Sequence, residues 1–147
     1  MKEHYVTYEQ GVKLKELGFA EKVNHAYLKK ISIEPELSVG DLKEVHSKDP
    51  KNYNDNRKGA EKGLFFYSAP RLDQAAAWLR EVKGWDITSI PTLAEYGEKK
   101  YRWDICHWSK PEYGNCSNGI FDTYELALSA GIDAALELLT NKLKNNG

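Results

Sequence analysis

The sequence predicts an α+β domain in which three main helices pack on a small mixed or antiparallel sheet, in a sandwich-like arrangement. Residues 70–83 and 123–142 both have apolar side chains at helical spacing, with small residues that let a helix lie close to a sheet. Residues 101–106 alternate apolar and polar side chains, as a half-buried strand does. The chain of 147 residues has the size of one ordinary domain, so we expect a single domain over residues 1–147.

The amino-acid composition limits the classes of protein to which this chain can belong. Hydrophobic residues make up 41% of the chain and charged residues 29%, which is typical of a globular protein. The 21 basic and 22 acidic residues give a net charge of −1, so a nucleic-acid ligand would need a local basic patch. No apolar run approaches the roughly 20 residues that cross a bilayer, and no apolar signal core begins the chain. We therefore expect a cytoplasmic protein with no membrane contact, and free thiols at Cys106 and Cys116.

A first helix is predicted over residues 8–17. Thr7 and Gln10 have the spacing of a capping box, in which each side chain bonds the backbone of the other residue. Gly18 suits the left-handed conformation that commonly follows a helix end. The helix should therefore begin after Thr7 and end before Gly18.

The segment after this helix contains a strand and a polar stretch. Residues 25–34 hold the β-branched and aromatic side chains of a strand, which Pro35 would end. Residues 37–45 fit either a helical turn or a short strand. Residues 46–63 contain one aromatic residue, no aliphatic residue larger than Ala, and five basic against three acidic side chains. They predict a mildly positive surface loop.

The middle of the chain predicts a buried strand followed by a helix. The apolar run of residues 64–67 indicates the strand. Pro70 suits the first turn of the helix, Ser68 or Ala69 would cap it, and Gly84 would end it. Its polar face balances charge without a convergent cluster, so we interpret this helix as a support. The expected buried face consists of Leu72, Ala75, Ala76, Leu79 and Val82, with Trp78 at its margin.

A hairpin is predicted next, with residues 85–96 and 99–108 as its two arms. Pro91 cannot donate to a strand ladder, so the first arm should be an edge strand or contain a bulge. We expect one sheet, built from the strand of residues 64–67 and the hairpin of residues 86–107.

The C-terminal part predicts a second loop and a long helix. Residues 109–119 are rich in turn formers, and Asp122 and Glu125 have capping-box spacing before residues 123–142. The expected buried stripe consists of Tyr124, Leu128, Gly131, Ile132, Ala135 and Leu139, and the expected solvent-facing side of Ser129, Asp133, Glu137 and Thr140.

Three local patterns carry a resemblance. They are LKELGF at the end of the first helix, SAP.L..A..WLRE in the middle helix and YELALSAGIDAALELL in the last. Together they resemble short uncharacterised proteins encoded by phages, prophages and conjugative elements of Bacteroides-like bacteria, over most of the chain except residues 46–63. The resemblance implies a phage or mobile-element origin, a bacterial host cell and an α+β sandwich-like fold. It implies no activity and no catalytic residue.

Candidate chemistry is sparse. Structural zinc sites usually show two close ligand pairs, whereas Cys106 and His107 are adjacent and would point to opposite faces of a strand. The same geometry disfavours a cysteine nucleophile, and residues 113–119 lack the Lys-Ser/Thr ending of a phosphate loop. We therefore predict no metal, no cofactor and no catalytic residue. The zinc ligands considered were Cys106, His107 and Cys116, with His4, His25 or His46 as a fourth.

Aromatic residues give the strongest functional signal. Six of them fall within the 26 residues 96–121. Polar neighbours make Trp108 and Tyr113 candidates for partial exposure, and the alternative is that they pack under residues 109–119. We predict a non-enzymatic module that binds an unknown protein partner. The alternative is a nucleic-acid-binding accessory protein that uses the basic residues 46–63 and the aromatic residues 96–113. The expected binding residues are Trp108, Tyr113, Tyr96, Lys99, Lys100, Arg102 and Lys110.

Overall fold

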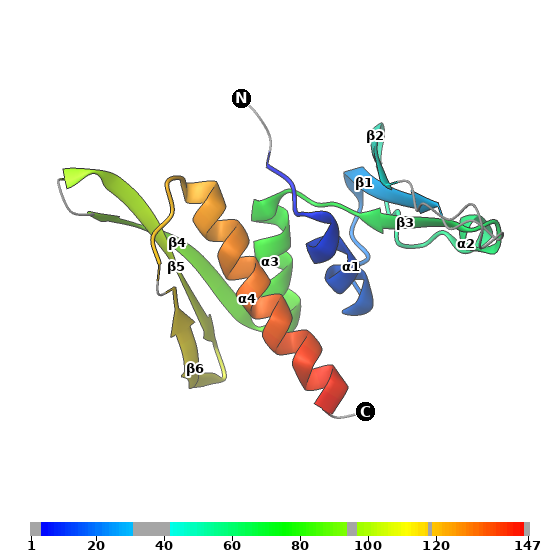
Figure 1. Ribbon diagram of the computed structural model, residues 1–147. Coiled ribbons are helices and arrows are strands. Elements are labelled where there is room, and N and C mark those ends of the chain that lie inside the picture. Colours follow the sequence, from blue (N-terminus) through cyan, green and yellow to red (C-terminus); the bar gives the residue numbers. More distant parts are fainter. Residues whose placement is uncertain (1–3, 31–41, 94–96, 118, 146–147) are drawn as a thin grey trace, which may run out of the picture. The chain divides into compact units, whose positions relative to one another are not determined.

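The chain forms two compact units, Tyr5–Pro70 and a second one made of Met1–His4 and Arg71–Gly147. Each unit has its own three-stranded antiparallel sheet and its own helices, which confirms the α+β class (Figure 1). The expectation that both units fold as one domain stays a prediction. The computed structural model describes residues 4–30, 42–93, 97–117 and 119–145.

The unit Tyr5–Pro70 has a sheet in the order β2–β1–β3, with both pairs antiparallel. Helices α1 and α2 contact β3. The two ends of the unit meet, because the Val6 N–H donates to the Pro70 carbonyl at 3.0 Å. Its elements are α1 (Tyr8–Glu16), β1 (Val23–Lys30), β2 (Leu42–Lys51), α2 (Arg57–Glu61) and β3 (Leu64–Ser68).

Helix α1 confirms the predicted start and end. The Thr7 hydroxyl accepts from the Gln10 N–H at 3.2 Å, and the Gln10 side chain accepts from the Thr7 N–H at 2.8 Å. Gly18 follows the helix with φ +94°, the left-handed region that favours glycine. Leu14 is fully buried on the inner side of α1.

The predicted loop of residues 46–63 is wrong. Most of it forms the end of β2 and the whole of α2. For residues 42–45 the strand alternative is confirmed and the helical turn is wrong. β2 lies at the sheet edge and its side chains are mostly exposed, so pairing of its backbone with β1 needs no apolar pattern.

The other two strands of this sheet were placed nearly correctly. β1 begins two residues earlier than expected, and the predicted end at Pro35 lies outside the described residues. β3 is a strand, but only Ser68 within it is buried and the rest is half-buried. Because β3 pairs with β1, the expected single sheet is wrong: the strand of residues 64–67 and the predicted hairpin belong to different sheets.

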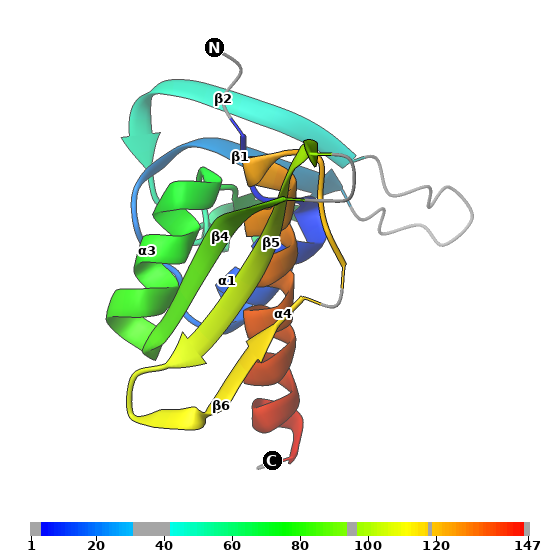
Figure 2. The same cartoon turned by 90° about the vertical axis from the view of Figure 1, so that its left-hand side faces the viewer.

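The second unit consists of a β4–β5–β6 meander with α3 and α4 side by side on one face (Figure 2). Trp85 and Ile105 from the sheet and Ala135 from α4 form its buried core cluster. Pro91 lies in the edge strand β4 opposite Tyr101, without a register shift, so the edge-strand alternative is correct. The elements are α3 (Leu72–Lys83), β4 (Trp85–Leu93), β5 (Lys99–His107), β6 (Lys110–Cys116) and α4 (Tyr124–Asn145).

Helix α3 differs from its prediction at both the start and the buried face. Arg71 is the N-cap and no side chain caps the helix, so the expected cap at Ser68 or Ala69 is wrong. Trp78 is 5% exposed, while Val82 is 57% exposed. Around the helix axis, Val82 points in the direction of the buried face, but it lies in the last turn of α3. Burial of a helix residue therefore depends on what covers its turn as well as on the direction of its side chain.

Helix α4 also shifts its buried face. Its first turn is capped by the Thr123 hydroxyl, which accepts from the Leu126 N–H at 3.1 Å, in place of the expected Asp122. Tyr124 is exposed, whereas Leu136 and Thr140 are buried. The Thr140 hydroxyl is satisfied inside the helix by donating to the Leu136 carbonyl at 2.9 Å.

Gly131, in the middle of α4, confirms that this helix packs closely against the sheet. A Cβ added at Gly131 would lie 2.9 Å from Ile87 Cγ2 and 3.1 Å from Trp103 Cβ. In contrast, the predicted loop of residues 109–119 is wrong, because β6 pairs with β5 over much of that range. In the described part of the chain, none of the helices has the length and apolar character that crossing a membrane requires.

Candidate functional site

The predicted binding residues form two groups at opposite ends of β5. Lys99, Lys100 and Arg102 lie toward its start, whereas Trp108 and Lys110 flank the turn into β6. A strand of nine residues spans about 25 Å, so these groups do not form one surface. Tyr96 lies outside the described residues. Tyr113 belongs to β6, but its side chain also lies outside them.

Lys100 and Arg102, near the start of β5, are paired with acidic side chains, whereas the Lys99 ammonium lies over the Tyr101 ring. The Lys100 ammonium bonds the Asp122 carboxylate and lies 3.5 Å from Glu98. The hydrogen bond to Asp122 is the main cause that raises the pKa of Lys100 above its ordinary value. The Arg102 guanidinium lies 4.0 Å from the Asp104 carboxylate. These pairings reduce the positive charge that a phosphate backbone would encounter.

Trp108 is the most exposed large hydrophobic residue of the described part of the chain, at 72%. The backbone nevertheless holds it in place, since its N–H donates to the Gly84 carbonyl at 3.1 Å. A Cβ at Gly84 would come within 2.5 Å of two indole atoms, Cδ1 and Nε1, and Gly84 has φ +77°. Gly84 must therefore be glycine both for its backbone conformation and for the indole that lies over it.

His107 and Ser109 stabilise the same turn. His107 Nε2 lies 3.1 Å from the Lys83 carbonyl, which can only accept, so Nε2 carries the proton. His107 Nδ1 then accepts from the Ser109 hydroxyl at 2.8 Å and from the Ser109 N–H at 3.3 Å. A serine nucleophile makes a similar contact with its base, but here both donors of Ser109 converge on one nitrogen and close the turn.

A pocket of about 570 Å³ lies beside this turn. Its lining includes the apolar surfaces of Trp85, Leu138 and Leu139 and the side chains of Lys83 and Lys110. Leu138 is 44% exposed, so apolar surface is open to solvent there. The combination of apolar walls with two cations fits a ligand that carries both an apolar group and a negative charge.

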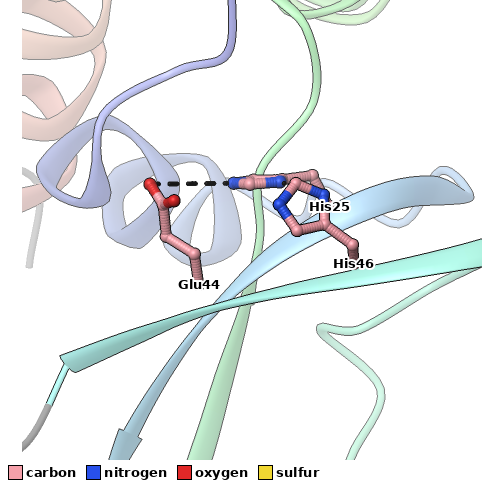
Figure 3. Close-up of side chains that lie close together, drawn as sticks. All are labelled: His25, Glu44 and His46. Carbon is pink, nitrogen blue, oxygen red and sulfur yellow. Dashed lines mark hydrogen bonds and ion pairs between the residues drawn. The ribbon is translucent and has the colours of Figure 1, made fainter.

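A second cluster lies in the other unit, on one face of the β1–β2 pair. His25 of β1 and His46 of β2 are directly opposite in the register, and Glu44 lies two residues from His46 on the same face. The two Nδ1 atoms of the histidines are 3.0 Å apart, and His25 Nε2 lies 4.0 Å from Glu44 Oε1 (Figure 3). His25 is 3% exposed, while Glu44 and His46 are exposed.

Two tyrosines hold the buried imidazole of this cluster. The Tyr5 ring stacks on His25 with centroids 4.2 Å apart and an interplanar angle of 16°. The Tyr27 ring meets His25 edge to face at 5.7 Å, and its hydroxyl donates to the Val6 carbonyl at 2.7 Å. The His25 ring is therefore fixed by packing as well as by the strand.

The cluster changes the proton affinity of two groups. Burial, and then the positive charge of a protonated His46, lowers the pKa of His25, while Glu44 partly opposes this effect. Burial raises the pKa of Tyr27, and the Glu44 and Glu9 charges add to the shift. Near neutral pH, Tyr27 is therefore a hydrogen-bond donor, and the neutral form of His25 is favoured.

This shift predicts that the metal-free protein loses stability as the pH falls. The unfolded chain binds a proton at His25 near its ordinary pKa of about 6.5, whereas folded His25 binds it only at lower pH. The contribution is therefore present above about pH 6.5 and is lost as the pH falls toward the folded pKa. Urea denaturation in chelator at pH 7 and pH 5 measures this loss.

His25→Gln should reduce the difference in the free energy of unfolding between the two pH values. An equal pH dependence in His25→Gln would show that other groups cause it.

Sequence reasoning considered His25 and His46 only together with Cys106, as a fourth zinc ligand or as the base of a cysteine nucleophile, and Cys106 belongs to the other unit. The signal that could have pointed to the cluster is the Glu-x-His spacing of residues 44–46, which places both side chains on one face of a strand. It was missed because a strand was only an alternative for residues 37–45 and residues 46–63 were predicted as a loop. Cys106 and Cys116 are free thiols, as expected.

Comparisons of the chain with protein-family models, with curated proteins and with solved structures found no match.

Proposed function

We propose that this chain is a non-enzymatic accessory protein that binds another protein through Trp108 and the adjacent pocket. The observation that supports this proposal is the exposed indole of Trp108, which lies over Gly84 while the Trp108 N–H donates to the Gly84 carbonyl. Rigid aromatic side chains contribute contact area at little cost in conformational entropy, and they are enriched among residues that dominate interface energies. A phage or mobile-element origin and a place in the bacterial cytoplasm belong to this proposal through the resemblance of the three helix patterns.

The pocket lining supports a particular partner chemistry. Trp85, Leu138 and Leu139 suit an aliphatic or aromatic side chain, and Lys83 and Lys110 suit a neighbouring carboxylate. We therefore propose that the partner presents a segment with an apolar residue next to Asp or Glu. The acidic partners of Lys100 and Arg102 favour a protein over a nucleic acid as the ligand.

A selection of random peptides on the purified protein tests this proposal. We expect the selected peptides to contain an apolar residue beside an acidic one, and Trp108→Ala to weaken their binding at least tenfold. Leu126→Ala is the matched control, because Leu126 is an equally apolar and 54% exposed residue on α4. This control should bind the peptides like the wild type.

Two measurements could contradict the proposal. Unchanged peptide binding by Trp108→Ala would remove the indole from the interface, and a loss of several kcal/mol in its free energy of unfolding would give Trp108 a structural role. A titration with single-stranded DNA at two salt concentrations tests the alternative ligand. Affinity that falls steeply with salt and is lost with Lys99→Ala and Arg102→Ala would favour nucleic acid instead.

A further inference from the structure

We propose that His25, His46 and Glu44 bind one divalent transition-metal ion, with Zn²⁺ as the best fit, on one face of the β1–β2 pair. Two imidazoles and a carboxylate form the protein ligand set of zinc sites that keep an open position for water or another ligand. The candidate ligand atoms of the three residues all lie within 4.8 Å of one another.

The distance between the imidazoles suits a shared ion. Each zinc-bound nitrogen lies at about 2.0–2.1 Å, so two nitrogens on one tetrahedral ion are about 3.3 Å apart. The Nδ1 atoms of His25 and His46 are 3.0 Å apart, so an opening of a few tenths of an ångström would accommodate the ion. The exposed side chain of His46 can provide this movement.

The strands place the donors before any ion arrives. His25 and His46 are direct cross-strand partners, and residues two apart on a strand point to the same side, which brings Glu44 to the same face. The Tyr5 ring stacked on His25 fixes the orientation of the buried imidazole, as the surroundings of metal ligands commonly do. The buried imidazole of His25 is therefore positioned before binding, whereas His46 and Glu44 adjust to the ion.

Glu44, the third donor, lies on the solvent side of the cluster, and the ion would enter from that side. The Glu44 side chain is 63% exposed, and its carboxylate lies 4.0 Å from His25 Nε2, so it must turn toward the Nδ1 side of the ring to share an ion with the two histidines. A flexible, exposed glutamate can rotate to complete the ligand set while water fills the remaining positions. Because β2 is an edge strand, the ion would also cross-link it to the central strand β1.

The experiment titrates the full, untagged chain with Zn²⁺ alone by calorimetry after chelator treatment, and with Co²⁺ by visible absorption. The background is Cys106→Ser with Cys116→Ser, because exposed thiols also bind these metals. We expect one ion per chain. His46→Ala should weaken the affinity by roughly 100-fold and Glu44→Gln by roughly tenfold, within the range that changes around metal sites produce.

His4→Ala is the matched control, since it removes an exposed histidine from the other unit, and its affinity should be that of the background protein. Both test positions are exposed, and circular dichroism verifies that each variant is folded. If His46→Ala fails this check, His46→Asn takes its place. No saturable binding in the cysteine-free background, or binding unchanged by both His46→Ala and Glu44→Gln, would overturn the proposal.

Discussion

Replacing Leu79 by Ala is expected to lower the free energy of unfolding by about 2–4 kcal/mol. The Leu79 side chain is fully buried on α3, the helix that contacts both β4 and α4. Truncation removes buried apolar surface and leaves a cavity that closely packed neighbours fill only in part. Urea denaturation followed by far-ultraviolet circular dichroism measures the change.

Val82→Ala provides the control on the same helix. Val82 is 57% exposed, so its truncation should change the free energy of unfolding by less than about 0.5 kcal/mol. A cost below about 1 kcal/mol for Leu79→Ala would show that this face of α3 is not tightly packed in solution.

The second large effect is expected from Asn54→Ala, at about 2–4 kcal/mol. The Asn54 side chain donates to the Phe19 carbonyl at 2.8 Å and accepts from the Ser68 N–H at 2.9 Å. It therefore joins the segment after α1 to the end of β3. Alanine would leave a carbonyl and an N–H without their partner, and each buried unsatisfied group costs about 1–3 kcal/mol.

Two further variants separate this bridge from a general effect of losing an asparagine. Asn54→Asp keeps the acceptor for Ser68 but places a negative charge beside the Phe19 carbonyl, so part of the stability should be lost. Asn24→Ala removes exposed bonds to the Ser47 and Lys48 carbonyls and should cost less than about 1 kcal/mol. Equal free energies of unfolding for Asn54→Ala and Asn24→Ala would mean that the bridge adds no stability.

Local signals predicted the three long helices and one hairpin, but not the short helix α2. The capping box of Thr7 and Gln10 fixed the start of α1, and the left-handed glycines at 18 and 84 marked two helix ends. These features depend on interactions between residues close in the chain, so a short stretch of sequence is enough to recognise them. The alternation around Trp103 predicted β5 for the same reason.

Strand pairing could not be predicted in this way. The apolar run at residues 64–67 indicates a strand but does not say which strand lies beside it, and it pairs with β1 and not with the hairpin. β2 carries little apolar periodicity because it is an edge strand whose side chains are mostly exposed. The backbone of β2 bonds to β1 and that of β6 bonds to β5, and such bonds need no apolar pattern.

The candidate sites show the same division. The sequence left two alternatives for Trp108, partial exposure or packing under residues 109–119, and the structure shows it exposed. The cluster of His25, Glu44 and His46 depends on the register between two strands, of which the second was only an alternative over residues 37–45 and was predicted as a loop from residue 46. Its geometry therefore required the structure.

The hydrogen bond between Val6 and Pro70 has a practical consequence for protein engineering. It holds Val6, next to the first residue of the unit Tyr5–Pro70, and Pro70, the last residue, at about the separation of two neighbouring strands, roughly 5 Å. A segment whose ends lie this close can be transplanted as a cassette into a surface turn of another protein, because the two ends of that turn need to move apart only slightly. The cluster of two histidines and a glutamate would travel inside that cassette to a host of choice.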